Sequence, residues 1–264
     1  MNIINSEQNH WIKKINALKK KKYREQYGQF VVEGIRICKE VIEKKAQVEG
    51  LFISKTLMEN EEIKELANCL PGKVYIVDAK LLEKTLSTVT PQGIASIVNK
   101  PYWDIKNVLD TGKTFLVLDG VSDPGNLGTL IRTSLAAGID GLFCLKGTVD
   151  IYNEKTLRST MGAFLKLPVF YIDDVEWFKT RLSILGISIV VADIRASKYY
   201  FELAYPEKTA LVLGSEAQGP LHIITGEETV KIPLSPDSES LNVAVAGSVI
   251  IYEIIRQKMV SVVK

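Results

Sequence analysis

The chain has 264 residues, of which 46% are hydrophobic and 24% are charged, and its formal net charge is +2. This length is enough for about two domains, and the composition is that of an ordinary soluble protein with buried cores. No apolar run approaches the roughly 18 residues of a membrane span, and no secretory leader opens the chain. We therefore expect a cytoplasmic protein without a membrane partner.

The first hundred residues alternate between predicted helices and strands. Trp11, Ile15 and Leu18 at helical spacing predict one helix over residues 6–28, with Ser6 or Asn9 as a possible cap. Strands are expected at residues 29–34, 48–54, 73–78 and 93–100, and helices at residues 35–45, 60–70 and 80–86. The stretch 100–113 interrupts this pattern. We expect an N-terminal α/β domain over residues 1–105.

Positive charge is concentrated at the start of the chain. Residues 1–30 carry seven basic and two acidic side chains, so the remainder has a slightly negative balance. A basic arm on a near-neutral body is typical of a polyanion contact. A solvated, lysine-rich helix face would produce the same pattern, and charge alone does not separate the two.

The second half, residues 106–264, reads as a second α/β domain. Strands are expected at residues 114–120, 141–146, 168–173, 187–194, 208–215 and 230–234, and helices at residues 129–138, 153–165, 175–186 and from 243 toward the C-terminus. Residues 222–228 have no clear pattern. Strands that alternate with helices predict a mostly parallel sheet covered on both faces.

Metal chemistry is not expected. The cysteines (Cys38, Cys69, Cys144) and the two histidines (His10, His222) are isolated from one another. Zinc sites use closely spaced Cys or His pairs. The sequence therefore predicts no metal site, and it also disfavours histidine-based acid–base chemistry.

Three loops of the second half follow predicted strands, where open α/β sheets bind their ligands. They contain DPGNLGTL (123–130), LVLGSEAQGP (211–220) and IPLSPDSESLN (232–242). None matches the dinucleotide fingerprint G-x-G-x-x-G or the phosphate-binding G-x-x-x-x-G-K-[ST]. A Rossmann-type oxidoreductase and a P-loop hydrolase are therefore disfavoured.

Taken together and in this order, the loops resemble the three motifs of the SpoU (TrmH-type) RNA ribose 2′-O-methyltransferases of the SPOUT superfamily. The matching segments are DPGNLGTLIRTSLAAG (123–138), LVLGSEAQG (211–219) and IPLSPDSESLNVAVAGSVIIYE (232–253). DIYNEKTLRSTMGAFLKLPV (150–169) is similar to the segment after the first motif in ribosomal RNA members. KYREQYGQFVVEGIRICKEVI (22–42) and TPQGIASIV (90–98) resemble the N-terminal substrate-binding domain of the family.

The resemblance implies a fold, a cofactor and partners. It implies a C-terminal trefoil knot, S-adenosylmethionine as the cofactor, RNA as the substrate and a homodimer. The N-terminal domain favours ribosomal RNA of the 23S type over transfer RNA. The alternative is a non-catalytic RNA-binding or ribosome-assembly factor with the same fold.

The resemblance also implies a role for particular residues. The catalytic set would be Arg132, Asn126, Glu216, Ser240 and Asn242; the cofactor would contact Leu213, Gly214, Gly219, Ile232, Leu234 and Leu241; RNA would contact Lys19, Lys20, Lys21, Lys22, Arg24 and Arg36. A guanidinium is effectively always protonated, so Arg132 is expected to bind a phosphate or the developing alkoxide rather than to act as the base. Ser240 could instead serve only as a helix N-cap.

Two features of these motifs bear on packing. Small residues from Ala244 to Ser248 are expected to let the last helix pack closely at the knot and the dimer interface. Ala217 and Pro236 stand where many members of the family have glycine, so the cofactor loops of this chain depart there from the family's pattern.

Overall fold

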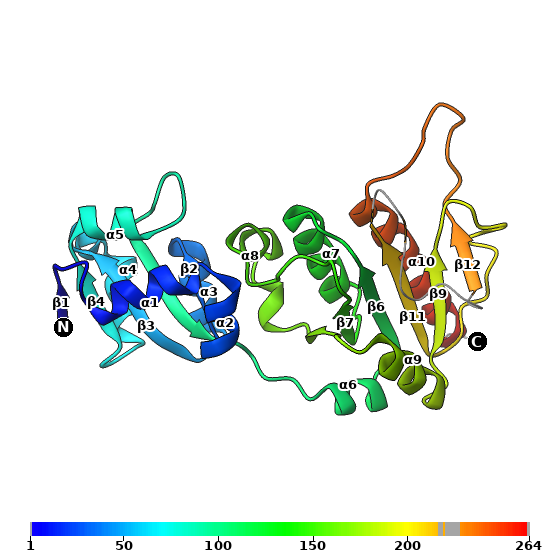
Figure 1. Cartoon of the computed structure of the whole chain (residues 1–264), viewed down its shortest axis with the longest axis horizontal. Coiled ribbons are helices and arrows are strands. Elements are labelled where there is room, and N and C mark those ends of the chain that lie inside the picture. Colours follow the sequence, from blue (N-terminus) through cyan, green and yellow to red (C-terminus); the bar gives the residue numbers. More distant parts are fainter. Residues whose placement is uncertain (1, 216–218, 220–227, 263–264) are drawn as a thin grey trace. The chain divides into compact units, whose positions relative to one another are not determined.

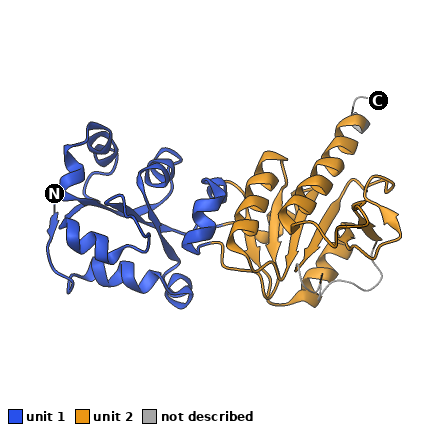
Figure 2. Ribbon diagram, turned by 90° about the horizontal axis from the view of Figure 1, so that it is seen from above, with its two compact units in different colours: residues 1–102, 152–165 blue, residues 103–151, 166–264 orange. Residues whose placement is uncertain are grey.

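The computed structural model describes residues 2–215, 219 and 228–262, and the chain forms two compact units (Figures 1 and 2). The first unit comprises Met1–Tyr102 together with Tyr152–Leu165, and the second comprises Trp103–Ile151 and Lys166–Lys264. A segment that the sequence places well inside the second half therefore packs with the first unit. The boundary at Tyr102–Trp103 lies close to the expected one at residue 105, and the expected domain limits stay a prediction.

The first unit is a mixed five-stranded sheet with helices on both faces. Its strand order is β1-β4-β3-β5-β2, and β5 runs antiparallel to both of its neighbours, β2 and β3. The elements are β1 (Asn2–Ile4), α1 (His10–Leu18), α2 (Lys21–Tyr27), β2 (Gln29–Glu33), α3 (Ile35–Glu43), β3 (Val48–Ser54), a 3-10 turn η1 (Lys55–Glu59), α4 (Glu61–Asn68), β4 (Val74–Val77), α5 (Ala79–Thr85) and β5 (Ile94–Asn99).

The basic N-terminal segment forms two helices rather than the single helix predicted. Asn9 caps α1 by accepting a hydrogen bond from the Trp11 N–H. The helix ends because Lys20 is extended and because the Arg24 guanidinium donates to the carbonyls of Leu18 and Lys19, which no longer have helical partners. The break turns a continuous basic face into a junction that projects Lys19 to Lys22 into solvent.

The segment 152–165 packs on β2 through aromatic side chains. It forms α8 (Glu154–Thr160) and a 3-10 turn η2 (Ala163–Leu165). The buried ring of Phe30 lies 4.6 Å from that of Tyr152 and 5.6 Å from that of Phe164; such pairs contribute about 0.5–1.5 kcal/mol each beyond area burial. The single helix predicted over 153–165 ends early because Met161 and Gly162 adopt left-handed conformations.

The second unit is an all-parallel seven-stranded sheet. Its order is β10-β12-β9-β11-β6-β7-β8, and every strand pair is parallel. The elements are α6 (Ile105–Thr111), β6 (Thr114–Asp119), α7 (Pro124–Ala136), β7 (Gly141–Cys144), β8 (Val169–Tyr171), α9 (Val175–Ile184), β9 (Ser188–Ala192), β10 (Lys198–Tyr199), β11 (Thr209–Gly214), β12 (Glu228–Lys231) and α10 (Val243–Val262). The predicted strand 230–234 is shorter than expected, and α6, β1 and β10 were not anticipated.

Both faces of this sheet are buried. Phe115 and Val117 of β6 join a core with residues of α6 and α9 on one face, while the alternate side chains, Leu116 and Leu118, are buried on the other face. That other face holds α7 and α10. This explains why the strands read as continuous apolar runs. None of the described helices combines the length and apolar composition that crossing a bilayer requires.

The last helix packs closely on its neighbours, as its small residues predict. A Cβ atom at Gly247 would lie 2.4 Å from Leu213 of β11 and 2.8 Å from Leu130 of α7, so only glycine fits there without displacement. The hydroxyls of Thr133 and Ser248 form a hydrogen bond across the same interface. Residues 216–218 and 220–227 lie outside the described residues, so the trefoil knot stays a prediction.

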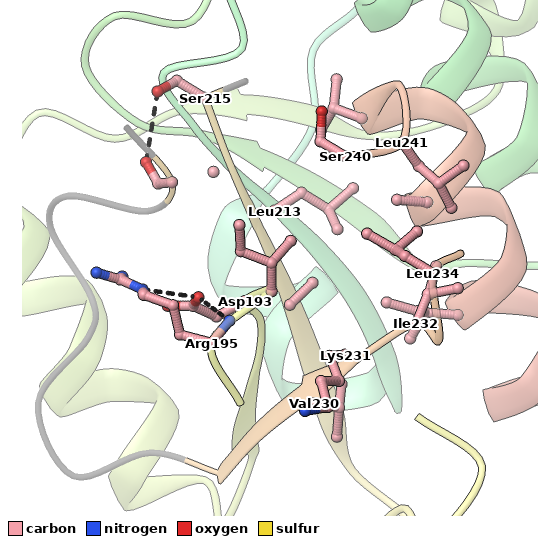
Figure 3. A pocket seen from close by; sticks show the side chains of 17 residues that line it. Asp193, Arg195, Leu213, Ser215, Val230, Lys231, Ile232, Leu234, Ser240 and Leu241 are labelled. Carbon is pink, nitrogen blue, oxygen red and sulfur yellow. Dashed lines mark hydrogen bonds and ion pairs between the residues drawn. The ribbon is translucent and has the colours of Figure 1, made fainter. Parts of the chain in front are cut away.

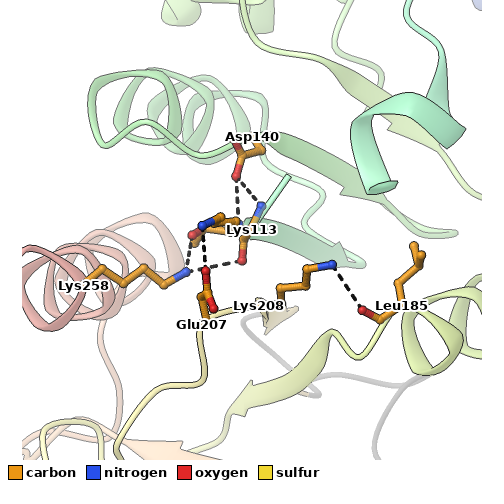
Figure 4. A network of polar contacts seen from close by, with 7 residues as sticks. Lys113, Asp140, Leu185, Glu207, Lys208 and Lys258 are labelled. Carbon is orange, nitrogen blue, oxygen red and sulfur yellow. Dashed lines mark hydrogen bonds and ion pairs between the residues drawn. The ribbon is translucent and has the colours of Figure 1, made fainter. Parts of the chain in front are cut away.

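A polar network joins the C-terminal half of α10 to the amino end of the sheet (Figure 4). The Lys258 ammonium donates to the Lys113 carbonyl and to the Thr114 hydroxyl at the start of β6. Lys113 pairs with Glu207 at 2.6 Å, and the Asp140 carboxylate accepts two backbone N–H groups from residues 113 and 114. Burial lowers the pKa of Lys258. The network lies at the end of the sheet opposite the loops of the three motifs.

Candidate functional site

A cavity of about 320 Å³ lies at the carboxyl ends of β9, β11 and β12 and beside the start of α10 (Figure 3). All six residues predicted to contact a cofactor line it: Leu213, Gly214, Gly219, Ile232, Leu234 and Leu241. Ser240 of the predicted catalytic set lines it as well. The loop after β11 and the segment before α10 thus meet in one pocket, although they are more than ten residues apart in the sequence.

The walls of the cavity arise from strand ends. Leu213 is the penultimate residue of β11, and its buried side chain closes the floor toward α10. β12 ends at Lys231, so Ile232 and Leu234 leave the ladder and turn toward the cavity (Figure 3). A single extended strand over 230–234 would have kept them in the sheet. The early end of β12 is therefore what makes them available to a ligand.

The loop after β11 closes on itself. Ser215 and Gly219 exchange backbone hydrogen bonds of 2.9 and 3.2 Å, and Gly219 has a φ of +68° that favours glycine. Both residues line the cavity. Glu216, predicted to be catalytic, and Ala217 lie outside the described residues.

The segment before α10 contains the polar residue that caps this helix. The Asn242 side-chain oxygen accepts hydrogen bonds from the N–H groups of Ala244 and Val245, so Asn242 is the cap and Ser240 is not. Ser240 is thereby left to face the cavity. Pro236 lies in a turn closed by the Ser238 N–H and the Ser235 carbonyl, where a fixed φ is favourable.

The first and third motifs meet through two asparagines. The Asn242 side-chain amide donates to the Asn126 side-chain oxygen at 2.9 Å, and the Asn126 N–H donates to the Asp123 carboxylate that caps α7. Asn126, Asn242 and Arg132 are not among the residues that line the cavity. Arg132 is exposed on α7, and no hydrogen bond or ion pair joins it to another described residue.

Sequence reasoning missed one wall of the cavity. Asp193, Ile194 and Arg195 follow β9 and line the pocket beside Lys231 (Figure 3). Arg195 donates to both Asp193 oxygens, at 2.7 and 3.0 Å, and this hydrogen bonding lowers the pKa of Asp193. The signal was available: β9 is a buried parallel strand, and ligands bind beyond the carboxyl ends of such strands.

The residues predicted to contact RNA divide into two groups. Lys19 to Lys22 and Arg36 are exposed on the first unit. Arg24 is only 6% exposed and donates to two backbone carbonyls, so it is suited to holding the α1–α2 junction and not to contacting RNA. Glu33 accepts hydrogen bonds from the N–H groups of Ser87 and Thr88 and so orders the loop before β5.

Comparison with known proteins decides the family. The SpoU rRNA Methylase family matches residues 113–252, more than half of the chain, and an MRM3-like substrate binding domain matches residues 9–96. The chain belongs to the SpoU rRNA methylase family. It is 31% identical, over 97% of its length and 94% of the relative's, to an uncharacterized tRNA/rRNA methyltransferase of Synechocystis.

A second relative and a solved structure extend this likeness. The 23S rRNA (guanosine(2553)-2′-O)-methyltransferase RlmP of Bacillus subtilis is 29% identical over 96% of this chain and 99% of its own. The AdoMet-bound rRNA methyltransferase of Sinorhizobium meliloti has a TM-score of 0.82 and 26% identity over 97% of both chains. The expectation of an S-adenosylmethionine-dependent rRNA ribose 2′-O-methyltransferase with an α/β fold is confirmed.

The cavity fits this cofactor. Pockets for ligands of this size are concave and mostly apolar, with a few polar groups, and typically occupy about 300–1,000 Å³. Here aliphatic side chains of Leu213, Ile232 and Leu241 offer surface to a flat ring, and the backbone from Gly214 to Ser215 offers polar groups. Among the described residues, no three Cys, His, Asp or Glu side chains gather where they could ligate a metal ion.

Proposed function

We propose that this SpoU methylase transfers a methyl group from S-adenosylmethionine to a ribose 2′-hydroxyl of 23S ribosomal RNA. The observation that carries the proposal is the convergence of six motif residues and Ser240 on one cavity. The 23S target is supported by the relative RlmP, which matches this chain over nearly the whole length of both. Cytoplasmic residence stays a prediction.

We assign cofactor binding to the cavity and substrate handling to the neighbouring polar residues. When bound, the cofactor supplies a methyl group already activated as a sulfonium, so the chain itself has to position the ribose and manage one proton. Ser240 faces the cavity, and the Asn126–Asn242 hydrogen bond holds the first motif against the third. Together they would orient the ribose at the mouth of the pocket.

Arg132 is assigned to the substrate oxygen or phosphate. Its permanent positive charge suits it to stabilise negative charge that develops on O2′, while the proton leaves through phosphate or water. Its exposure leaves the guanidinium free to meet an anion. Asn126 lies six residues earlier in the same helix, so its side chain is about 120° away from that of Arg132 around the helix axis, and the two groups would contact different parts of the substrate.

We further propose a homodimer in which Arg132 serves the partner's cavity. Val245, Tyr252 and Met259 lie seven residues apart along α10 and are 50%, 51% and 67% exposed, so they form an apolar stripe on the helix that borders the cavity. Exposed stripes of this kind mark association surfaces. A shared site would explain why Arg132 does not line the cavity of its own chain.

Methyl mapping tests the activity. Ribosomal RNA from cells that lack the protein is incubated with the enzyme and cofactor, and 2′-O-methylation is located by resistance to alkaline cleavage. We expect one new ribose methyl in 23S rRNA. Arg132→Ala should retain cofactor affinity by calorimetry and lose methyl transfer, and Arg132→Lys should recover part of it. Loss of cofactor binding in Arg132→Ala would contradict the division of roles.

Subunit mixing tests the shared site. Arg132→Ala and the cavity variant Leu241→Glu are each expected to be inactive. Co-expression would place an intact cavity beside an intact arginine in one of the two sites of each mixed dimer. Random pairing should then restore about a quarter of wild-type activity. No restoration in an isolated mixed dimer would show that each chain uses its own arginine.

A further inference from the structure

A polar cavity of about 210 Å³ lies within the first unit, among the end of α1, β2 and α8. Lys19 lines it from the end of α1 and Glu33 from β2, and α8 and the residues before it contribute five of the twelve lining residues: Tyr152, Asn153, Glu154, Lys155 and Arg158. The matched substrate-binding domain ends at residue 96 and does not include α8. A large part of this cavity therefore comes from a segment outside the matched substrate-binding domain.

The carboxylates of the cavity are already engaged. Glu33 accepts three backbone hydrogen bonds of 3.0–3.1 Å, and Glu154 pairs with Arg158 at 2.6 Å. Lys19 and Lys155, by contrast, are exposed and form no hydrogen bond or ion pair with the described residues, although Lys19 interacts electrostatically with Glu154. The charge left for a ligand is positive, so the cavity fits an anion and not a metal ion.

A second cavity continues the first. It has a volume of about 170 Å³ and shares Glu33 and Arg158 with its neighbour. Arg36, exposed at the start of α3, lines its far side, and the only other carboxylate in its lining, Glu40, is paired with Lys44. Cations thus follow one another from Lys19 through Lys155 and Arg158 of α8 to Arg36, and of these four Arg158 is the one in an ion pair with another described residue, Glu154. A single small anion would need one such site, whereas a chain of phosphates needs several in a row.

We propose that α8 is part of the RNA-binding surface, and that Lys155 and Arg158 bind backbone phosphates of the RNA together with Lys19 and Arg36. This inference rests on the proposed function, because it takes ribosomal RNA as the occupant. α8 is also joined by the chain to β7 on one side and β8 on the other. The chain therefore connects α8 directly to the second unit at both of its ends, in addition to the 102–103 connection between the two units.

Salt-dependent RNA binding tests the inference. The probe is a fluorescein-labelled 23S rRNA fragment centred on nucleotide 2553, the position in the name of the Bacillus relative. Each phosphate contact contributes about 0.7 to the slope of log Kd against log salt for single strands. Lys155→Gln/Arg158→Gln should therefore weaken binding several-fold and flatten the slope by about 1.4. Cofactor affinity should not change, because the cofactor cavity belongs to the other unit.

Two further variants make the result decisive. Arg158→Gln leaves Glu154 without its partner, so Lys155→Glu tests the surface at an exposed position that does not stabilise the fold. Lys80→Glu on α5 is the matched control, since Lys80 is exposed, carries the same change of charge and lines neither cavity. If Lys155→Glu binds RNA like Lys80→Glu, α8 is not a contact. If wild-type protein binds no 23S fragment at all, the proposed function fails first.

Discussion

Gly247→Ala should disturb the cofactor cavity from the opposite side of a helix. The added Cβ would lie 2.4 Å from Leu213 and 2.8 Å from Leu130, roughly 1.1 and 0.7 Å short of the lower end of the ~3.5–4.0 Å range of ordinary carbon contacts. Both leucines are buried, but Leu213 borders the cavity and can move into it, whereas Leu130 packs within the core. Leu213 also lines the cavity, which makes it the link between packing and ligand binding.

The magnitude follows from two opposing effects. Overpacking a core costs about 1–3 kcal/mol, whereas replacing glycine by alanine inside a helix gains about 1 kcal/mol. The net free energy of unfolding should fall by about 1 kcal/mol, which lowers Tm by about 2–4 °C for a domain of this size. Displacement of Leu213 into the cavity should weaken cofactor binding by about fivefold, equivalent to about 1 kcal/mol.

Thermal unfolding and calorimetric titration with S-adenosylmethionine measure the two effects. Leu130→Val serves as the rescue, because it makes room on the α7 side without touching the cavity. In Gly247→Ala/Leu130→Val the two losses of stability should be less than additive by about 0.5–3 kcal/mol, and cofactor affinity should recover. A more stable Gly247→Ala protein with unchanged affinity would refute the reasoning.

Two further predictions concern thiols and pH. Only the exposed Cys69 should react quickly with a thiol reagent in the native protein, since Cys144 is buried and burial raises the pKa of Cys38 to about 12; two fast thiols would contradict this. Arg195 lowers the pKa of Asp193 below its unfolded value of about 3.9, so the pair stabilises the fold above that pH and loses its effect as acid protonates the carboxylate. Asp193→Asn should therefore lower Tm more at pH 7 than at pH 3, where part of the carboxylate's stabilising effect is already lost, and an equal loss at both would count against the pairing.

Local patterns in the sequence were sufficient for most of the helices and strands. Strand and helix positions follow from periodicity, and the three loops could be placed at the carboxyl ends of strands because parallel sheets present those ends at one edge. Leu213, Ile232 and Leu241 were named from the resemblance of those loops to the family's motifs, and they lie together in one cavity. Short elements such as β10, with two residues, carry too little pattern to be seen.

Only the tertiary structure showed which groups individual side chains bind and which unit each segment packs with. Charge suggested that Arg24 meets RNA, but its guanidinium is buried against the end of α1, because a broken helix leaves carbonyls that need donors. The sequence offered Ser240 as a possible cap of α10, but the hydrogen bonds show that Asn242 is the cap.

The proposal for this chain depends on one physical condition, that residues distant in sequence are brought onto shared surfaces. Residues 152–165 pack with the first unit because the rings of Tyr152 and Phe164 contact the ring of Phe30. No local sequence pattern predicts this long-range contact. Sequence sets which faces are apolar and where strands end. Which of those faces meet is settled by packing across the whole fold, and that choice creates both the cofactor cavity and the basic cavity beside α8.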